Sequence, residues 1–247
     1  MISNNSNSRK RNIEINCDVG EGFDNESELF LYIQSCNIAC GGHAGDQRSM
    51  QNVVELAIKN NIKIGAHPSY PDKKNFGRRT VTMKAWSLHD SIQYQVNLLH
   101  QIILKNGGIL HHIKPHGALY NDIAKNTELA MHFLNAINPF KAAIKLYVPY
   151  NSVIAEKAKK YGFEIIYEAF ADRNYNDDLS LLTRNEKKAL ITDPNKILQH
   201  VLYMLNNGKV NTITGKKIPI KAETFCVHSD TKNALEIVKK LYHGIMQ

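Results

Sequence analysis

The sequence predicts an α/β fold in which seven parallel strands close into a barrel. Short apolar runs alternate along the whole chain with longer segments whose apolar residues have helical spacing. Repeated strand–helix units of this kind give parallel strands joined by right-handed crossovers. Polar residues directly follow six of the seven runs. The strand ends of a barrel form one ring around a common site, whereas an open sheet gathers only the loops near its switch point. The ring of polar residues therefore favours the barrel.

The predicted elements follow from apolar runs and helical spacing. The strands are expected at 13–17, 35–39, 62–66, 108–113, 143–148, 163–170 and 223–227. The helices are expected at 26–33, 48–59, 84–105, 123–136, 152–161, 194–205 and 231–242. Asp193 and Pro194 suit the N-cap and first turn of a helix, and a small hairpin is expected within 206–222. We expect a disordered tail at 1–11 and a single barrel domain at 12–247.

The composition restricts the classes of protein to consider. Hydrophobic residues make up 43% and charged residues 22% of the 247, which is ordinary globular usage. No apolar run approaches the ~18 residues that span a bilayer, so no membrane partner is expected. The net charge is +8, but the basic residues are dispersed outside a cluster at 9–11. We therefore expect no nucleic-acid partner and a surface that suits anionic substrates. The four cysteines, without an apolar export signal at 1–12, are expected to be reduced thiols in the cytoplasm.

A glycine-rich turn follows the first predicted strand. Asn16 and Asp18 would share one face of that strand and point into the barrel mouth. Glu21 follows between two glycines that let the backbone turn sharply and approach a ligand. A turn in which Asp18 caps local amides is an equal alternative for this motif alone.

The second predicted strand also runs into a glycine turn. Cys36, Cys40 and His43 resemble half of a zinc site, but the second half with tetrahedral spacing is missing beside them, so the two cysteines are expected to pack as small apolar residues. His43 lies in a glycine-flanked loop with no helix face to fill, which favours a functional role, and Asp46 follows it.

The third predicted strand ends at His67, which is followed by two prolines that fix the loop. Arg78 and Arg79 come later in the same loop. A guanidinium group binds carboxylate or phosphate through two parallel hydrogen bonds, although exposed arginines are also common. These three residues are candidates for the site.

The segment LHHIKPHGALYN (110–121) contains the densest group of polar residues. Strand alternation places His112 and Lys114 on one side and His111 on the other, so we expect His111 in the outer, helix-facing layer. A buried lysine here is expected to have a lowered pKa, and His116 would titrate near neutrality. The proline between His112 and His116 forbids the helix in which their spacing would suit a metal. Tyr120 completes the candidates in this segment.

The last two clusters follow the sixth and seventh predicted strands. Asp172 and Arg173 follow the sixth strand, and His228 and Asp230 follow the seventh. Asp230 or Thr231 is expected to cap the last helix. Together with the earlier clusters, these groups supply what acid–base chemistry on an amide or ester uses.

These motifs resemble the LamB/YcsF family, which is the family of the 5-oxoprolinase A subunits. The resemblance covers about 12–241 and rests on NCDVGEG, NIACGGHAGD, GAHPSYPD with FGRR, KPHGALYN, FADR-Y and CVHSDT-NA, which occur in the family's order. This sequence departs from the family at Gly42, Ser229 and Lys232, where Phe, Gly and Pro are usual, and near Arg184, where a Pro-Gly pair is usual. The serine at 229 adds a side chain beside the expected site.

The resemblance implies a barrel of the glycoside hydrolase/deacetylase type and the ATP-dependent opening of 5-oxo-L-proline to L-glutamate, with partner subunits B and C. No Walker motif is found: GKK at 215–217 lacks the Ser or Thr, and Val210 stands where a glycine is needed. ATP is therefore expected on a partner or on other groups of this chain. A stand-alone metal-dependent amidohydrolase or deacetylase, and a subunit that only binds the lactam, remain alternatives.

The site residues are expected in three overlapping groups. The catalytic candidates are Asp18, His43, His67, Lys114 and His116. The candidates for binding substrate or phosphate are Asn16, Glu21, Asp46, Arg78, Arg79, Tyr120, Asp172, Arg173, His228 and Asp230. A divalent metal held by Asp18, His43, His67 and His112 is one alternative for this cluster, and acid–base catalysis through hydrogen bonds without a metal is the other.

Overall fold

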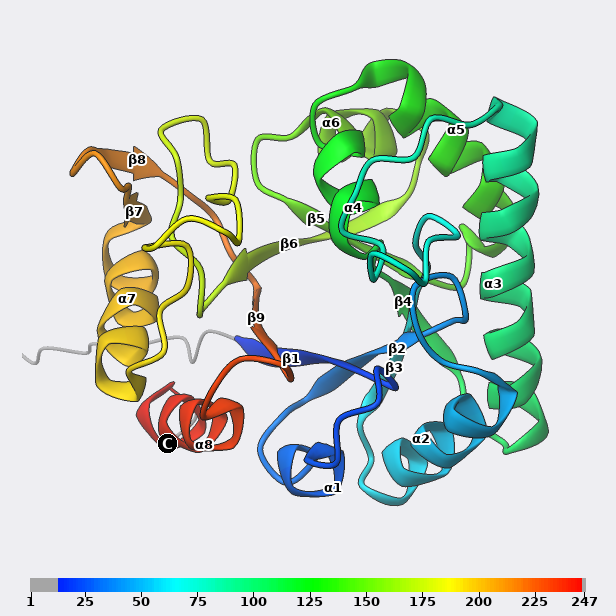
Figure 1. Cartoon of the computed structure of the whole chain (residues 1–247), viewed down its shortest axis with the longest axis horizontal. Helices are drawn as coiled ribbons and strands as arrows, with labels where there is room; N and C mark the ends of the chain where they lie inside the picture. The colour runs from blue at the N-terminus through cyan, green and yellow to red at the C-terminus, as the bar shows by residue number, and fades with distance from the viewer. Residues whose placement is uncertain (1–12, 246–247) are drawn as a thin grey trace, which may run out of the picture.

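A computed structural model describes residues 13–245 and contains the expected closed barrel (Figure 1). Its parallel strands are β1 (Glu14–Val19), β2 (Ser35–Ala39), β3 (Lys63–His67), β4 (Leu110–Ile113), β5 (Lys145–Pro149), β6 (Glu164–Phe170) and β9 (Thr224–His228). They pair in this order, and β9 closes the barrel by pairing with both β6 and β1. The prediction of a seven-stranded parallel barrel is confirmed. The tail expected at 1–11 lies outside the described residues.

Helices surround the barrel, with α2, α3 and α5 on one side and α7 and α8 on the other (Figure 1). The helices are α1 (Glu26–Leu29), α2 (Gln47–Lys59), α3 (Ala85–Lys105), α4 (Gly117–Ile123), α5 (Thr127–Ile137), α6 (Val153–Lys160), α7 (Pro194–Asn207) and α8 (Ala234–Ile245), with a 3-10 turn at Asn138–Phe140. The helix predicted at 123–136 is two helices, because the Asn126 side chain accepts a hydrogen bond from the Leu129 amide and starts α5 afresh. The helix predicted at 26–33 ends early, at Leu29.

Two local predictions for the C-terminal third are confirmed. Strands β7 (Lys209–Asn211) and β8 (Lys217–Pro219) form the antiparallel hairpin expected within 206–222. The Asp193 side chain accepts hydrogen bonds from the amides of Asn195 and Lys196 at the start of α7. The cap expected at the last helix is wrong, because α8 begins only at Ala234.

The barrel interior is polar, while the layer between strands and helices is apolar. Buried apolar side chains such as Ile15 and Ile38 alternate along the strands with the buried polar side chains of Asn16 and Asn37. A Cβ atom at Gly65 of β3 would lie 2.1 Å from the Nε2 atom of His112, so glycine makes room for that ring. The polar residues thus form a column inside the barrel, below the ends of the strands.

The cysteines are all free and buried, as expected. Burial raises the pKa of the Cys40 thiol to about 12, and it also raises the pKa of the other three thiols. Among residues 13–245, no helix is both long and apolar enough to cross a membrane.

Candidate active site

A buried lysine joins three strands at the centre of the site. The Lys114 Nζ atom lies 2.9 Å from Asp18 Oδ1 of β1, 3.0 Å from Glu168 Oε1 of β6 and 3.0 Å from Cys226 Sγ of β9. Burial alone would lower the pKa of Lys114, but the charge of Asp18, followed by Cys226 and Glu168, raises it well above its usual value. The expectation of a lowered pKa is therefore wrong, because buried carboxylates surround the ammonium group.

An asparagine of β2 orients the Asp18 carboxylate. The Asn37 Nδ2 atom donates to Oδ1 of Asp18 and to Oδ1 of Asn16, both at 2.8 Å, which confirms that these two residues share one face of β1. Asn37 and Lys114 both bind Oδ1 of Asp18. The other carboxylate oxygen, Oδ2, lies 3.4 Å from the Nε2 atom of His67. Burial opposes ionisation of Asp18, but the charges of His67 and Lys114 hold its pKa well below the usual range.

His112 lies deeper in the barrel than the other predicted histidines. Its Nε2 atom lies 2.8 Å from Oδ1 of Asn37, its Nδ1 atom lies 3.0 Å from Nδ1 of His111, and its ring stacks on Tyr147. Both ring nitrogens therefore have protein partners. The prediction of His112 as a metal ligand is corrected: it lies inside the barrel, as alternation indicated, but one layer below the mouth. His111 is half-buried beside it.

A second group gathers four side chains above Asp18: Glu21, His43, His67 and His116. Oε1 of Glu21 lies 2.9 Å from His43 Nε2 and 3.5 Å from His116 Nδ1, and His116 Nδ1 lies 3.0 Å from His67 Nε2. The rings of His43 and His116 stack, with their centroids 3.6 Å apart. One ligand atom from each residue lies within 4.8 Å of all the others, so this group is able to hold a metal ion.

Burial controls the charge states in this group. It lowers the pKa of His43 to about 3 and that of His116 well below the usual value. Burial, reinforced by the charge of Asp18, raises the pKa of Glu21 to about 7. His43 and His116 are therefore favoured as neutral imidazoles, which are the form that binds metals.

Asp172 and Asp230 have different partners at the ends of β6 and β9. Asp172 is buried and accepts hydrogen bonds from the backbone amide and Nδ1 of His228 and from the Thr231 hydroxyl. Asp230 pairs instead with Arg78 and Arg184. Neither Asp230 nor Thr231 is therefore available to cap α8. Asp172 orients the His228 ring, while Asp230 holds two arginines at the mouth.

A cavity of about 690 Å³ opens above these groups. Its lining includes Asp18, His67, Lys114, His116 and His228, but not Glu21 or His43. Six cations line it: Arg78, Arg79, Lys114, Lys125, Arg173 and Arg184. Tyr120 also contributes, next to Glu168. This excess of cations suits a small anionic ligand.

Asp46 takes no part in the cavity. Its side chain is exposed and accepts a hydrogen bond of 2.8 Å from the Ser49 amide, which caps helix α2. Its prediction as a binding residue is therefore corrected, because a polar residue just after a strand end can belong to the next helix instead.

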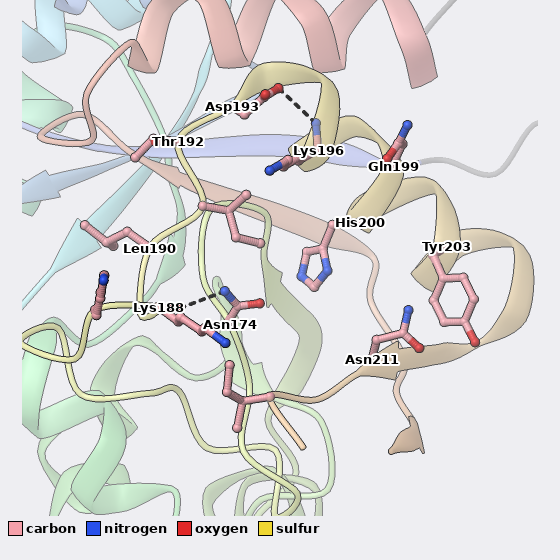
Figure 2. A pocket seen from close by; sticks show the side chains of 13 residues that line it. Asn174, Lys188, Leu190, Thr192, Asp193, Lys196, Gln199, His200, Tyr203 and Asn211 are labelled. Atoms are coloured by element: carbon pink, nitrogen blue, oxygen red, sulfur yellow. Dashed lines mark hydrogen bonds between the residues drawn. The ribbon is translucent and has the colours of Figure 1, made fainter. Parts of the chain in front are cut away.

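A separate cavity of about 680 Å³ lies beside α7, and Figure 2 shows its lining, which includes Lys188, Lys196 and His200. None of the predicted site residues lines it. Its single carboxylate, Asp193, caps α7. This cavity therefore contains none of the residues predicted for acid–base chemistry.

Comparison with known proteins gives the family. The model of the LamB/YcsF family matches residues 13–247. This chain belongs to the LamB/YcsF family. A relative from Bacillus cereus (strain 03BB102), named as the A subunit of 5-oxoprolinase, is 40% identical over 236 residues, which are 93% of each chain.

Solved structures agree with this assignment to the LamB/YcsF family. The lactam utilization protein from Thermus thermophilus is 32% identical, with a TM-score of 0.88 over 95% of this chain and 96% of that chain. A putative cellobiose-phosphate cleavage protein from Enterococcus faecalis is 11% identical, with a TM-score of 0.52 over 95% and 90% of the two chains, and shows the fold alone.

The structure shows the surroundings of Gly42 and Ser229, two positions at which this chain departs from the usual LamB/YcsF sequence. A Cβ atom at Gly42 would lie 2.4 Å from Oε1 of Gln95 and from the Ser69 hydroxyl, so Gln95 occupies the space into which a side chain at 42 would extend. The Ser229 hydroxyl is buried without a hydrogen-bond partner in the described part of the chain. It does not line the cavity.

The LamB/YcsF site also contains residues outside the predicted set. Glu168 is 2% exposed and pairs with Lys114, and Asn37 orients Asp18. The sequence contained an indication for Glu168. It is a carboxylate within an apolar strand, and it lies an even number of residues from Asp172, so alternation places both side chains on the same face. Arg184 is the third addition, since it reaches Asp230 from a long loop.

Proposed function

We propose that this chain is the A subunit of an ATP-dependent 5-oxoprolinase, which hydrolyses the lactam of 5-oxo-L-proline to L-glutamate with partner subunits B and C. The observation that carries the proposal is one cavity with a buried carboxylate–lysine–histidine site at its floor and arginines at its mouth. The name of the Bacillus cereus relative supports the substrate and the partners. The reaction is placed in the cytoplasm, where ATP is available.

The substrate matches this distribution of charge. 5-Oxo-L-proline is a small anion, and its carboxylate would bind an arginine at the mouth, with Arg79 as the best candidate because Arg78 already pairs with Asp230. The lactam would then extend toward Lys114 and His116 at the floor. Binding of both ends would fix the orientation of the ring.

The chemistry needs an activated carbonyl and a proton acceptor. Transfer of the γ-phosphoryl group of ATP to the lactam oxygen makes the ring carbon electrophilic. Water then adds to that carbon, and the C–N bond breaks so that the nitrogen leaves as the amine and an acyl phosphate remains. A second water hydrolyses the acyl phosphate to the carboxylate and releases phosphate. Asp18 is proposed to accept the proton of the water through Oδ2, since Asn37 and Lys114 occupy Oδ1. The proton that Asp18 accepts is then returned to the departing nitrogen.

ATP is the cofactor in this proposal, although the chain carries no Walker motif. The arginines of the mouth are suited to hold phosphates, and a partner subunit is the other source of a nucleotide site.

The test combines the purified chain with candidate B and C subunits and measures glutamate formed from 5-oxo-L-proline with and without ATP. We expect glutamate only with all three subunits and ATP. We expect Asp18→Asn and His116→Ala to abolish the activity, whereas the control Asp90→Asn changes an exposed carboxylate and retains it. Glutamate from this chain without ATP would instead establish a stand-alone hydrolase. Unchanged activity in both site variants would indicate a subunit that only binds the lactam.

A further inference from the structure

We propose that Glu21, His43, His67 and His116 form a binding site for a divalent transition-metal ion of the zinc class, at the wall of the cavity. The site belongs to the same barrel mouth as the proposed function and deepens it. Its ligand set differs from the one the sequence predicted, because Glu21 and His116 replace Asp18 and His112.

The backbone contacts of two histidines fix which nitrogen atoms carry hydrogen. The Nδ1 atom of His67 lies 2.7 Å from the carbonyl oxygen of Lys114, and the Nε2 atom of His116 lies 2.9 Å from the carbonyl oxygen of Phe76. A carbonyl oxygen only accepts, so both of these nitrogens must donate. In a neutral imidazole the other nitrogen then carries a lone pair.

The two remaining nitrogens face each other. Nε2 of His67 and Nδ1 of His116 are 3.0 Å apart, and both are lone-pair acceptors when the rings are neutral. Glu21 Oε1, a third acceptor, lies 3.5 Å from the same atom of His116. Acceptors packed this closely in a buried site need a positive charge between them, either a shared proton or a cation.

The separations of the atoms suit a metal ion. Four ligands at about 2.0–2.1 Å from a tetrahedral zinc ion lie about 3.3 Å from one another. The contacts between Glu21 and His43, between Glu21 and His116, and between His67 and His116 are 2.9, 3.5 and 3.0 Å. Histidine ligands of metals also usually donate their other N–H to a backbone carbonyl or a carboxylate, as His67 and His116 do here.

The donor atoms select the class of ion. Three imidazole nitrogens and one carboxylate oxygen suit zinc, cobalt, iron or nickel, whereas magnesium and calcium prefer oxygen ligands. A second metal-compatible group, Asp18, Cys226 and His228, is a poorer candidate. The Lys114 ammonium group already lies 2.9–3.0 Å from the first two of these residues. A bound ion at the first group would supply a Lewis acid beside Asp18.

The first test measures metal content without using activity. The chain is purified without a histidine tag, analysed for metals by mass spectrometry, stripped with a chelator and titrated with zinc by calorimetry. We expect about one equivalent of metal per chain and a higher thermal midpoint when zinc is restored. A chain that is free of metal and binds none of zinc, cobalt, iron or nickel would overturn the proposal and leave a shared proton as the explanation.

The second test identifies the ligands. We expect Glu21→Gln, which is nearly isosteric, and His116→Ala to weaken zinc binding by about 100-fold or more. Loss of a residue that only supports a ligand weakens metal binding by about 10–100-fold, and loss of a ligand itself should cost at least as much. The matched controls His112→Gln, outside the group, and His132→Ala, on an exposed helix surface, should bind zinc as the unaltered chain does. Loss of binding in His112→Gln with retention in Glu21→Gln would refute this ligand set.

These results are independent of the reaction. Zinc binding without glutamate formation would leave the site standing and reject the proposed function. Glutamate formation by a chain that binds no metal would support the proposed function and reject the metal site.

Discussion

Replacement of Lys114 by methionine tests the central ion pairs of the barrel. Lys114 is 1% exposed and its ammonium group pairs with both Asp18 and Glu168. Methionine preserves most of the side-chain volume but leaves two buried carboxylates without their shared cation. Removal of one partner from a buried ion pair costs about 3–5 kcal/mol of the free energy of unfolding. Asp18 keeps Asn37 as a donor, so most of this loss is expected to come from Glu168.

Urea unfolding followed by far-ultraviolet circular dichroism measures the effect. At pH 7 we expect Lys114→Met to lower the free energy of unfolding by about 3–5 kcal/mol. Adding Glu168→Gln should recover part of that loss, because the uncompensated charge is removed. The control Lys160→Met changes an exposed lysine that pairs with Glu156, and we expect little effect from it.

The loss should also depend on pH with a defined sign. In the unaltered chain the pKa of Asp18 is held well below normal, so this stabilisation is present above the unfolded pKa of about 3.9 and is lost only as the pH falls through the folded value. Without Lys114, the buried carboxylates should have raised pKa values. Their burial then destabilises the variant increasingly as the pH rises. The difference between the two chains should shrink from pH 8 to pH 5. A difference below about 1 kcal/mol at pH 7, without recovery in the double variant, would refute this account.

Three further predictions concern stability. Burial alone would raise the pKa of Asp172, but His228 and Thr231 lower it to about 2. The lowered pKa adds about 2 kcal/mol to the free energy of unfolding above pH 4, and this stabilisation is lost as the pH falls toward 2. The variant Asp172→Asn should not show this loss in an acid titration of stability. Gly42→Ala should destabilise the chain by about 1–3 kcal/mol through the clash with Gln95, and in urea melts the cost of the double change with Gln95→Ala should be less than the sum of the single costs. Ser229→Ala removes a buried hydroxyl that has no partner among residues 13–245 and should raise the free energy of unfolding by about 1 kcal/mol, whereas a decrease would show that the hydroxyl is bonded.

The strands of this fold could be predicted from sequence because each is a short apolar run with a polar residue at its end. The helix at 117–123 was missed because it begins directly after the strand-end motif, where His116 occupies the N-cap position. Strand alternation placed His112 on the inner side correctly. It could not give the height of that residue in the barrel, because height depends on how neighbouring strands are staggered.

The site was predictable where a residue lies at a strand end, as Asp18 and His67 do. The pairing of side chains was not predictable where loops of different length meet, as for Glu21 with His43 or Arg184 with Asp230. Asp46 shows the opposite failure: its position after a strand suggested a role in binding, yet the serine three residues later marks it as a helix cap. The position of a residue in a strand predicts the face of the sheet on which its side chain lies. The residues that this side chain contacts depend on how the loops and helices pack.

The buried thiols give this chain an internal reporter of barrel opening. Cys226, Cys17 and Cys36 lie on β9, β1 and β2, three consecutive strands that include the pairing by which the barrel closes. Their raised pKa values and complete burial leave them unreactive while these strands stay paired. A thiol reagent would therefore modify them only as fast as the strands separate. The kinetics of labelling, resolved cysteine by cysteine, would show whether the barrel opens at the β9–β1 seam or unfolds as a whole.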